Sequence, residues 1–253
     1  MRIIFWCEFP ERVNWDEVKK LIKFKSEIYV ACKDKKGFLS LKNKIKSKNI
    51  DFGVWPILDL EEGYWFSGFL SEESINKLDE FKGEKIKIDI EPPFPGKSKN
   101  SYLFLLKYLF LGGKNNKYLR EKIIELSKNS KIVVSGFPLP LFFRKRYGHF
   151  DYDGVEKSYI AYTTFFKSLR VYYSWFIKKE LKWDKELIVG LGCVGEGIFG
   201  NEPVYRNLKE FKRDLEWVKK MGVKNIVIFD ISGLMNRRDR EDWVEVLERY
   251  VVN

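Results

Sequence analysis

The stretch KIKIDIEPP, residues 85–93, reads as a short β-strand that ends in two carboxylates and a pair of prolines. Side chains alternate between the two faces of a strand, so Lys87, Asp89 and Glu91 share one face and the isoleucines share the other. The apolar face suits contact with a layer of helices. We therefore expect Asp89 and Glu91 to point the other way, at the carboxyl end of this strand.

Seven further runs of similar character lie along the chain. The expected strands are Ile3–Cys7, Ile28–Cys32, Phe52–Ile57, Ile86–Ile90, Ile132–Ser135, Ser158–Tyr162, Leu187–Leu191 and Asn225–Phe229. Charged stretches with helical periodicity separate them, such as Leu208–Met221 before Gly222 and the last one, Asp239–Val251. Asn14 and Ser71 are expected helix N-caps. Eight strands that alternate with helices predict an α/β fold, a single (β/α)8 TIM-type barrel.

The length of 253 residues suits one such barrel, so we expect residues 1–253 to form a single domain. The alternative is an open doubly wound sheet. That fold usually carries a glycine-rich turn after its first strand, and the sequence CEFPE at residues 7–11 has no glycine.

Active sites of such barrels form at the carboxyl ends of the strands, and polar residues follow several expected strands. The carboxylates at these positions are Glu8, Asp59, Asp89, Glu91, Glu202 and Asp230. They contrast with a net charge of +11 for the whole chain. This local concentration of acid predicts a binding site at the barrel mouth, meaning the carboxyl ends of the strands and the loops that follow them.

Asp89 and Glu91 are the expected chemical centre of that site. Two close carboxylates raise one another's pKa, which prepares one of them as a general acid near neutral pH. The alternative is a structural pair of carboxylates neutralised by Lys87 or by an arginine.

Aromatic residues interleave with acids in the third expected strand and the segment after it, at Trp55, Asp59, Tyr64 and Trp65. Rings stack on sugar faces and carboxylates accept hydroxyl protons, so this segment favours a carbohydrate site. The alternative is a loop packed by its own aromatic side chains.

The segment after the seventh expected strand is rich in glycine and also carries Glu196, Asn201 and Glu202, which we take as substrate-binding candidates. Residues 190–195 match G-x-G-x-x-G. This match lies late in the chain and lacks the acidic residue of a dinucleotide site, so a phosphate site here is a minor alternative.

Metal and cofactor sites are not expected. His149 is the sole histidine, which argues against a zinc hydrolase, although a magnesium site built from oxygens stays open. Cys7, Cys32 and Cys193 are far apart and suggest neither a zinc site nor a disulfide framework.

The basic charge comes mostly from scattered lysines without a nucleic-acid-binding signature, so we expect no nucleic-acid partner. The chain has no glutamine, one histidine and abundant Lys and Glu, a bias typical of thermophilic proteins.

No segment reads as a signal peptide or a membrane span. The apolar runs Tyr102–Leu111 and Tyr159–Ile177 are interrupted by charges and fall short of the roughly 20 residues that cross a bilayer. They leave only a minor expectation of contact with a membrane surface. We expect a cytoplasmic protein.

The ending Asp89-x-Glu91, a tyrosine at the end of the sixth expected strand (Tyr162) and the aromatic-rich mouth resemble the chitinase-type barrels of glycoside hydrolase family 18. The motif of that family is D-x-x-D-x-D-x-E, and its two earlier acidic positions fall on Glu84 and Lys87. The resemblance implies that Glu91 is the general acid. It also implies that Asp89 orients a substrate acetamido group acting as internal nucleophile, with support from Tyr162.

The sequence therefore predicts a glycoside-hydrolase-like barrel that acts on a sugar-containing ligand by carboxylate acid catalysis. Two alternatives stay open. One is a non-catalytic barrel that binds a carbohydrate or glycoconjugate. The other is a phosphate- or magnesium-dependent lyase or isomerase that uses the glycine-rich segment.

Overall fold

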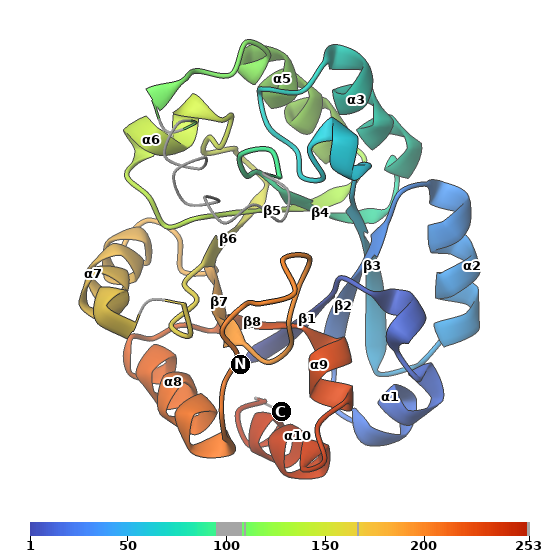
Figure 1. The fold of residues 1–253 in the computed structure, drawn as a ribbon, viewed down its shortest axis with the longest axis vertical. Coiled ribbons are helices and arrows are strands. Elements are labelled where there is room, and N and C mark those ends of the chain that lie inside the picture. Colours follow the sequence, from blue (N-terminus) through green and yellow to red (C-terminus); the bar gives the residue numbers. More distant parts are fainter. Residues whose placement is uncertain (95–107, 109, 166, 252–253) are drawn as a thin grey trace. The chain divides into compact units, whose positions relative to one another are not determined.

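The computed structural model describes residues 1–94, 108, 110–165 and 167–251. Eight strands form a closed barrel in the order β1 to β8, with helices outside the strands (Figure 1). The strands are β1 (Arg2–Cys7), β2 (Ser26–Cys32), β3 (Ile50–Pro56), β4 (Lys85–Asp89), β5 (Lys131–Gly136), β6 (Glu156–Ile160), β7 (Ile188–Cys193) and β8 (Asn225–Phe229). The predicted (β/α)8 TIM-type barrel is confirmed.

The helices follow the strands in the chain. They are α1 (Trp15–Leu21), α2 (Lys35–Ile45), α3 (Glu72–Asn76), α5 (Asn116–Ser127), α6 (Leu141–Arg146), α7 (Arg170–Glu180), α8 (Leu208–Lys220), α9 (Ile231–Met235) and α10 (Arg240–Glu248). Short 3-10 turns are η1 (Pro10–Arg12), η2 (Leu60–Glu62), η3 (Lys77–Phe81) and η4 (Lys167–Leu169).

The expected N-caps are present. The side chain of Asn14 accepts a hydrogen bond from the Glu17 amide at 3.3 Å, and that of Ser71 accepts one from the Ser74 amide at 3.1 Å. Helix α8 ends just before Gly222, whose φ of +83° is the left-handed conformation that favours glycine after a helix. The last helix, α10, is shorter than the predicted Asp239–Val251.

All eight predicted strands exist, but several bounds differ. Strand β2 begins at Ser26 rather than Ile28 because backbone pairing with β1 starts there, at Ile3 opposite Ser26. Strand β6 ends at Ile160, so Tyr162 lies just beyond it rather than at its last position. Strand β7 continues through the glycines to Cys193.

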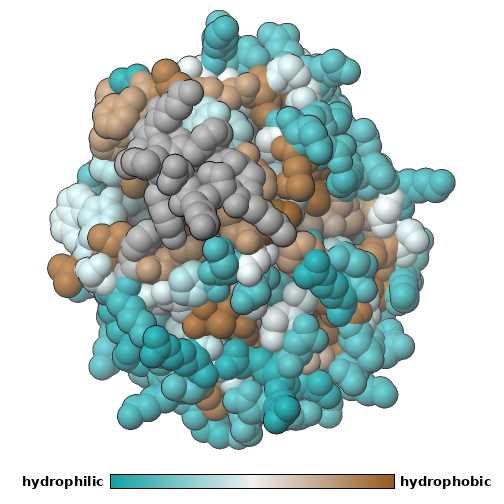
Figure 2. Space-filling model, in the orientation of Figure 1, coloured by the Kyte–Doolittle hydropathy of each residue, from teal (hydrophilic) through white to brown (hydrophobic). Residues whose placement is uncertain are grey.

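The chain divides into two compact units. The first comprises Met1–Ala31, Leu39–Gly53 and Ser158–Asn253, and the second comprises Cys32–Phe38 and Val54–Lys157. In the first unit the rings of Phe211 and Trp243 stack at 4.8 Å between α8 and α10. The outer surface of these two helices is mostly hydrophilic (Figure 2), as expected for helices that bury one apolar stripe.

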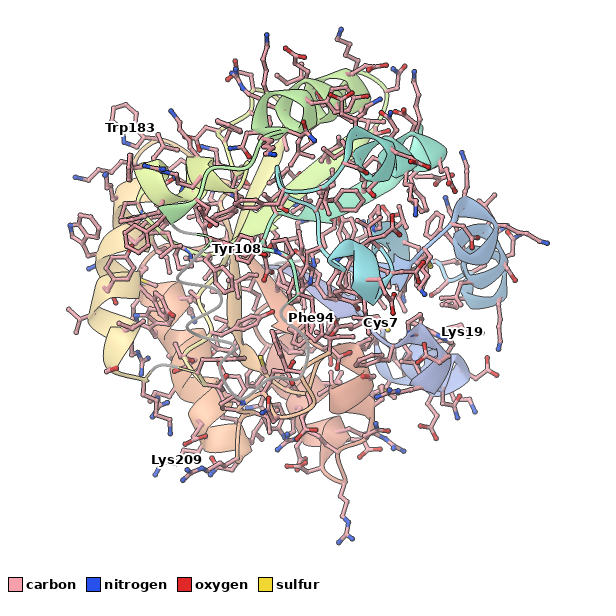
Figure 3. The ribbon with its side chains drawn as sticks, turned by 45° about the horizontal axis from the view of Figure 1, so that its top comes forward. Cys7, Lys19, Phe94, Tyr108, Trp183 and Lys209 are labelled. Atoms are coloured by element: carbon pink, nitrogen blue, oxygen red, sulfur yellow. The ribbon has the colours of Figure 1, made fainter. Side chains whose placement is uncertain are left out.

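No helix among the described residues is both long and apolar enough to cross a membrane. The predicted apolar run Tyr159–Ile177 is divided between β6 and α7, and most of Tyr102–Leu111 lies outside the described residues. Helix α7 exposes Val171 and Trp175, and Trp183 after it is 85% exposed (Figure 3).

Candidate functional site

The carboxyl end of β4 holds a buried ion pair within the second unit. Lys87 Nζ lies 2.5 Å from Asp89 Oδ2, and the side chains are 0% and 3% exposed. The same ammonium group lies 3.3 Å from the centroid of the Trp55 ring on β3. This contact confirms that Lys87 and Asp89 share a face of the strand, as the alternation of side chains predicts.

Burial, rather than a neighbouring carboxylate, governs the titration of Asp89. Loss of hydration raises the pKa of Asp89, and the charge of Lys87 acts in the opposite direction. Our expectation that Asp89 and Glu91 raise one another's pKa is therefore corrected for Asp89, because its immediate charged neighbour is a cation. The ion pair with Lys87 fits the structural alternative, and a catalytic role of Asp89 stays a prediction.

Only one of the two carboxylate oxygens of Asp89 binds Lys87. Lys87 binds Oδ2, whereas Oδ1 has no hydrogen-bond partner among the described residues. Ser135, which pairs with Asp89 in register on β5, has a buried hydroxyl that helps to lower the pKa of Asp89, although it forms no hydrogen bond of ordinary geometry among the described residues. Buried polar atoms of this kind are uncommon and call for an explanation, such as a ligand or water.

Glu91 lies two residues beyond Asp89 on backbone that continues the strand. The Glu91 amide donates to Phe66 O at 3.1 Å, and the Ile90 amide donates to Ser135 O at 2.8 Å. The Glu91 side chain is 7% exposed. The two acids of the predicted centre thus lie together at the end of β4.

The predicted aromatic residues near this end are buried. Tyr64 and Trp65 contact each other at 5.4 Å, and Phe94 lies 6.3 Å from Tyr64 and 5.7 Å from Trp65. Tyr64 and Trp65 are 4% and 6% exposed. The loop is therefore packed by its own aromatic side chains, which was the alternative interpretation of this segment. Asp59 is exposed and forms an ion pair with Lys33.

A second acidic cluster lies within the first unit, around Gly197. A Cβ atom on Gly197 would lie 2.6 Å from Glu8 Oε2 and 2.8 Å from Glu202 Oε1, so both carboxylates approach the same stretch of backbone. Glu202 also accepts hydrogen bonds from the amides of Phe199 at 2.9 Å and Asn201 at 3.1 Å. These contacts bring the predicted residues Glu8 and Glu202 together.

Asp230 has a structural role at the start of α9. Its carboxylate accepts hydrogen bonds from the Gly233 amide and the Ser232 hydroxyl, both at 2.8 Å, and from the Glu8 amide at 3.4 Å. Burial raises the pKa of Asp230, and the hydrogen bonds act in the opposite direction. Asp230 is an N-cap that joins α9 to the end of β1.

The glycine-rich segment approaches carboxylates closely. A Cβ on Gly195 would lie 2.6 Å from Asp230 Oδ1, much as one on Gly197 would meet Glu8 and Glu202. An anion here would meet three carboxylates, which disfavours the minor phosphate-site alternative. Glu196 and Asn201 are exposed.

Tyr162 packs between two rings of the first unit. Its ring lies 5.8 Å from both Phe165 and Phe229, with interplanar angles of 29° and 28°. The proposed contribution of its hydroxyl to chemistry stays a prediction.

Sequence reasoning missed a buried network around Asp214 on α8. Asp214 is fully buried, accepts hydrogen bonds from Thr163 and Tyr205, and lies 3.3 Å from the guanidinium groups of Arg170 and Arg213. The burial of Asp214 could have been predicted from its position on the apolar stripe of the helix, beside Leu215 and three residues after Phe211.

The burial of His149 was also not predicted from the sequence. Arg144 Nη1 lies 3.2 Å from His149 Nδ1, and because arginine only donates, Nδ1 accepts and Nε2 carries the proton. Burial, with help from Arg144, lowers the pKa of His149 to about 3. The folded protein therefore holds a neutral imidazole at physiological pH.

We expect the stability of the protein to fall on acidification because of His149. The unfolded chain binds a proton near the ordinary histidine pKa of about 6.5, whereas the folded chain does so only near 3. Between these values His149 makes stability rise with pH by about 1.4 kcal/mol per unit. Denaturant unfolding at several pH values should show a smaller slope for His149→Asn. Equal slopes in the two proteins would contradict the assignment.

Metal ligands are not grouped in the described ranges. No set of three His, Cys, Asp or Glu side chains in residues 1–94, 108, 110–165 and 167–251 is placed to hold a metal ion.

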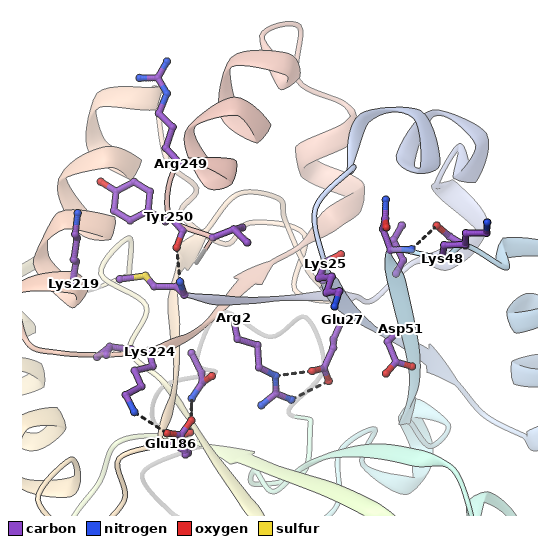
Figure 4. A pocket seen from close by; sticks show the side chains of 18 of the residues that line it. Arg2, Lys25, Glu27, Lys48, Asp51, Glu186, Lys219, Lys224, Arg249 and Tyr250 are labelled. Carbon is purple, nitrogen blue, oxygen red and sulfur yellow. Dashed lines mark hydrogen bonds and ion pairs between the residues drawn. The ribbon is translucent and has the colours of Figure 1, made fainter. Parts of the chain in front are cut away.

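A cavity of about 1260 Å³ lies within the first unit at the opposite ends of the strands (Figure 4). Arg2, Ser26, Ile50 and Asn225, the first residues of β1, β2, β3 and β8, line it. All the predicted site residues belong to the carboxyl ends of the strands, so this cavity was not predicted from the sequence.

Comparisons with known proteins give a fold but no family. No family model matches the chain, and no curated protein matches it. Among solved structures, a family 18 chitinase from Crocus vernus has a TM-score of 0.50 at 12% identity, covering 99% of this chain and 98% of that one. A xylose isomerase domain protein from Planctomyces limnophilus has a TM-score of 0.50 at 9% identity, covering 98% and 94%. At such low identity these likenesses support a TIM-type barrel and do not single out the chitinase family.

Proposed function

We propose that this barrel acts on a sugar-containing ligand at the end of β4, as a glycoside hydrolase in which Glu91 is the acid and Asp89 orients the substrate. The observation that carries the proposal is the buried Lys87–Asp89 pair, in which one carboxylate oxygen forms no hydrogen bond of ordinary geometry among the described residues. A purely structural ion pair would gain from satisfying both oxygens.

The free oxygen suits an amide N–H group of a ligand. Lys87 holds Asp89 Oδ2 in place and opposes the rise in the pKa of Asp89 that burial causes, so Oδ1 has a fixed position as an acceptor. A sugar with an acetamido group offers such a donor next to its anomeric carbon. Held there, the acetamido oxygen attacks the anomeric carbon while Glu91 protonates the leaving oxygen, which is the substrate-assisted route.

Two observations limit how the ligand binds. Asp89 and Glu91 are 3% and 7% exposed, so the proposal requires neighbouring side chains to move aside when a sugar enters. Tyr64 and Trp65 are packed against each other and Phe94, so we do not assign them to sugar stacking. The alternative function, a barrel that binds a carbohydrate without cleaving it, would use the same contact with Asp89 but would not need Glu91 as an acid.

The proposal includes the cytoplasm as its compartment. Cys32 and Cys193 are free thiols, in keeping with a reducing environment.

The binding of a thiazoline analogue of N-acetylglucosamine tests the role of Asp89. This compound mimics the cyclised acetamido intermediate, so a site of this kind binds it more tightly than N-acetylglucosamine. Calorimetry should show binding by the wild type and at least about tenfold weaker binding by Asp89→Asn, because the amide cannot replace a charged acceptor. Asp79→Asn, an exposed aspartate of the same unit, is the control. Equal affinity in all three proteins would remove Asp89 from the site.

A further inference from the structure

The cavity at the amino ends of the strands is lined by more cations than anions. Its basic side chains are Arg2, Lys25, Lys48, Lys219, Lys224 and Arg249, and its acidic side chains are Glu27, Asp51 and Glu186. Figure 4 shows these groups around one opening. The excess of positive charge predicts attraction of an anion.

Ion pairs already engage half of the basic groups. Arg2 binds Glu27 through two hydrogen bonds of 2.6 and 2.9 Å, and Lys224 lies 3.0 Å from Glu186. Arg249 pairs with Glu245 one helical turn earlier. These ion pairs make the two arginines and Lys224 less available to an anion than the remaining three lysines.

Lys25, Lys48 and Lys219 keep their charge available. Within the part of the chain that the structure describes, none of them forms an ion pair with a carboxylate. Lys219 Nζ lies 5.2 Å from the centroid of the Tyr250 ring. Lys219 lies in the last turn of α8, where a positive charge stabilises the helix by interacting with its dipole. Lys25 and Lys48 lie outside helices, so they do not stabilise a helix in this way.

Ser26 adds a neutral polar group to the same cavity. It is 6% exposed, and its hydroxyl has no hydrogen-bond partner among the described residues. A buried hydroxyl of this kind costs folding free energy unless something else satisfies it.

We propose that this cavity binds an anion that carries two or more phosphate groups. Lysine binds phosphate as a point charge on a flexible stem, so several lysines around one cavity can contact successive groups of a phosphate chain. The volume of about 1260 Å³ exceeds the roughly 300–1,000 Å³ of ordinary small-molecule sites and leaves room for an extended ligand. The ring of Tyr250 beside Lys219 offers a surface on which a nucleobase stacks.

Calorimetry at low salt with inorganic tripolyphosphate tests the proposal. The triple variant Lys25→Gln, Lys48→Gln, Lys219→Gln should weaken binding by about tenfold or more, since each exposed charge pair contributes modestly. The matched control is Lys20→Gln, Lys209→Gln, Lys212→Gln, which removes three equally exposed lysines of the same unit outside the cavity. The control should bind within about threefold of wild type.

Two results would overturn the proposal: no binding by the wild type, or equal weakening in both triple variants, which would mean attraction to general surface charge.

A parallel titration with ATP identifies the source of the phosphates. Tighter binding of ATP that Tyr250→Leu reduces to the level of tripolyphosphate supports a nucleotide ligand. Equal affinities support recognition of the phosphate chain alone.

Discussion

Glu91→Gln is expected to lower the rate of glycoside hydrolysis by about 10²–10⁴-fold, because the amide cannot donate a proton to the leaving oxygen. The loss should depend on the leaving group. A methyl glycoside needs protonation and should be cleaved far more slowly by the variant. A dinitrophenyl glycoside leaves without a proton, so its kcat/KM, which reports cleavage of the glycosidic bond, should be close to that of the wild type.

This dependence separates an acid from a residue that merely supports the fold. Glu91 is buried at the end of β4, so its replacement could also disturb packing, and that effect would slow all substrates alike. Glu61→Gln, at an exposed glutamate of the same unit, is the control and should leave both rates unchanged. An equal loss on both substrates would assign Glu91 a structural role and remove it as the acid.

Lys87→Met is expected to destabilise the protein by about 3–5 kcal/mol, because it leaves the Asp89 carboxylate buried without its counter-charge. The pKa of Asp89 should then rise further. Thermal unfolding should shift down by roughly 10 °C for a chain of this size. The double variant Lys87→Met, Asp89→Leu should recover most of this loss, because neither charge is then buried.

Lys131→Met on the neighbouring strand β5 is the matched control. Lys131 forms a 3.0 Å ion pair with Glu156, but the two side chains are 44% and 25% exposed. Such a pair contributes about 1 kcal/mol or less. If Lys87→Met were no more costly than Lys131→Met, the Lys87–Asp89 pair would not be the buried ion pair described above.

The barrel could be predicted because strands covered on both faces are continuous apolar runs. Strand β8 matches the predicted Asn225–Phe229 residue for residue. The bounds of β2 and β6 could not be read as well, because pairing with neighbouring strands decides where each begins and ends. Asn14 and Ser71 were predictable because capping depends on local sequence alone.

The site was predictable only in part. Alternation along β4 placed Lys87 beside Asp89, but the contact with Trp55 depends on β3 and on the side-chain conformations. The approach of Glu8 and Glu202 to Gly197 joins distant parts of the chain, and no local pattern encodes it. The amino-end cavity is built from ordinary first residues of strands, none of which has a distinctive sequence signal.

The most direct measurement is the release of para-nitrophenol by the wild type from an aryl N-acetylglucosaminide and from the matching glucoside. With Asp89 orienting an acetamido nucleophile, we predict hydrolysis of the acetylated substrate and rates at least about 100-fold lower without that group, since intramolecular attack is lost. Hydrolysis of neither substrate, or of both at the same rate, would contradict the proposed site at the end of β4.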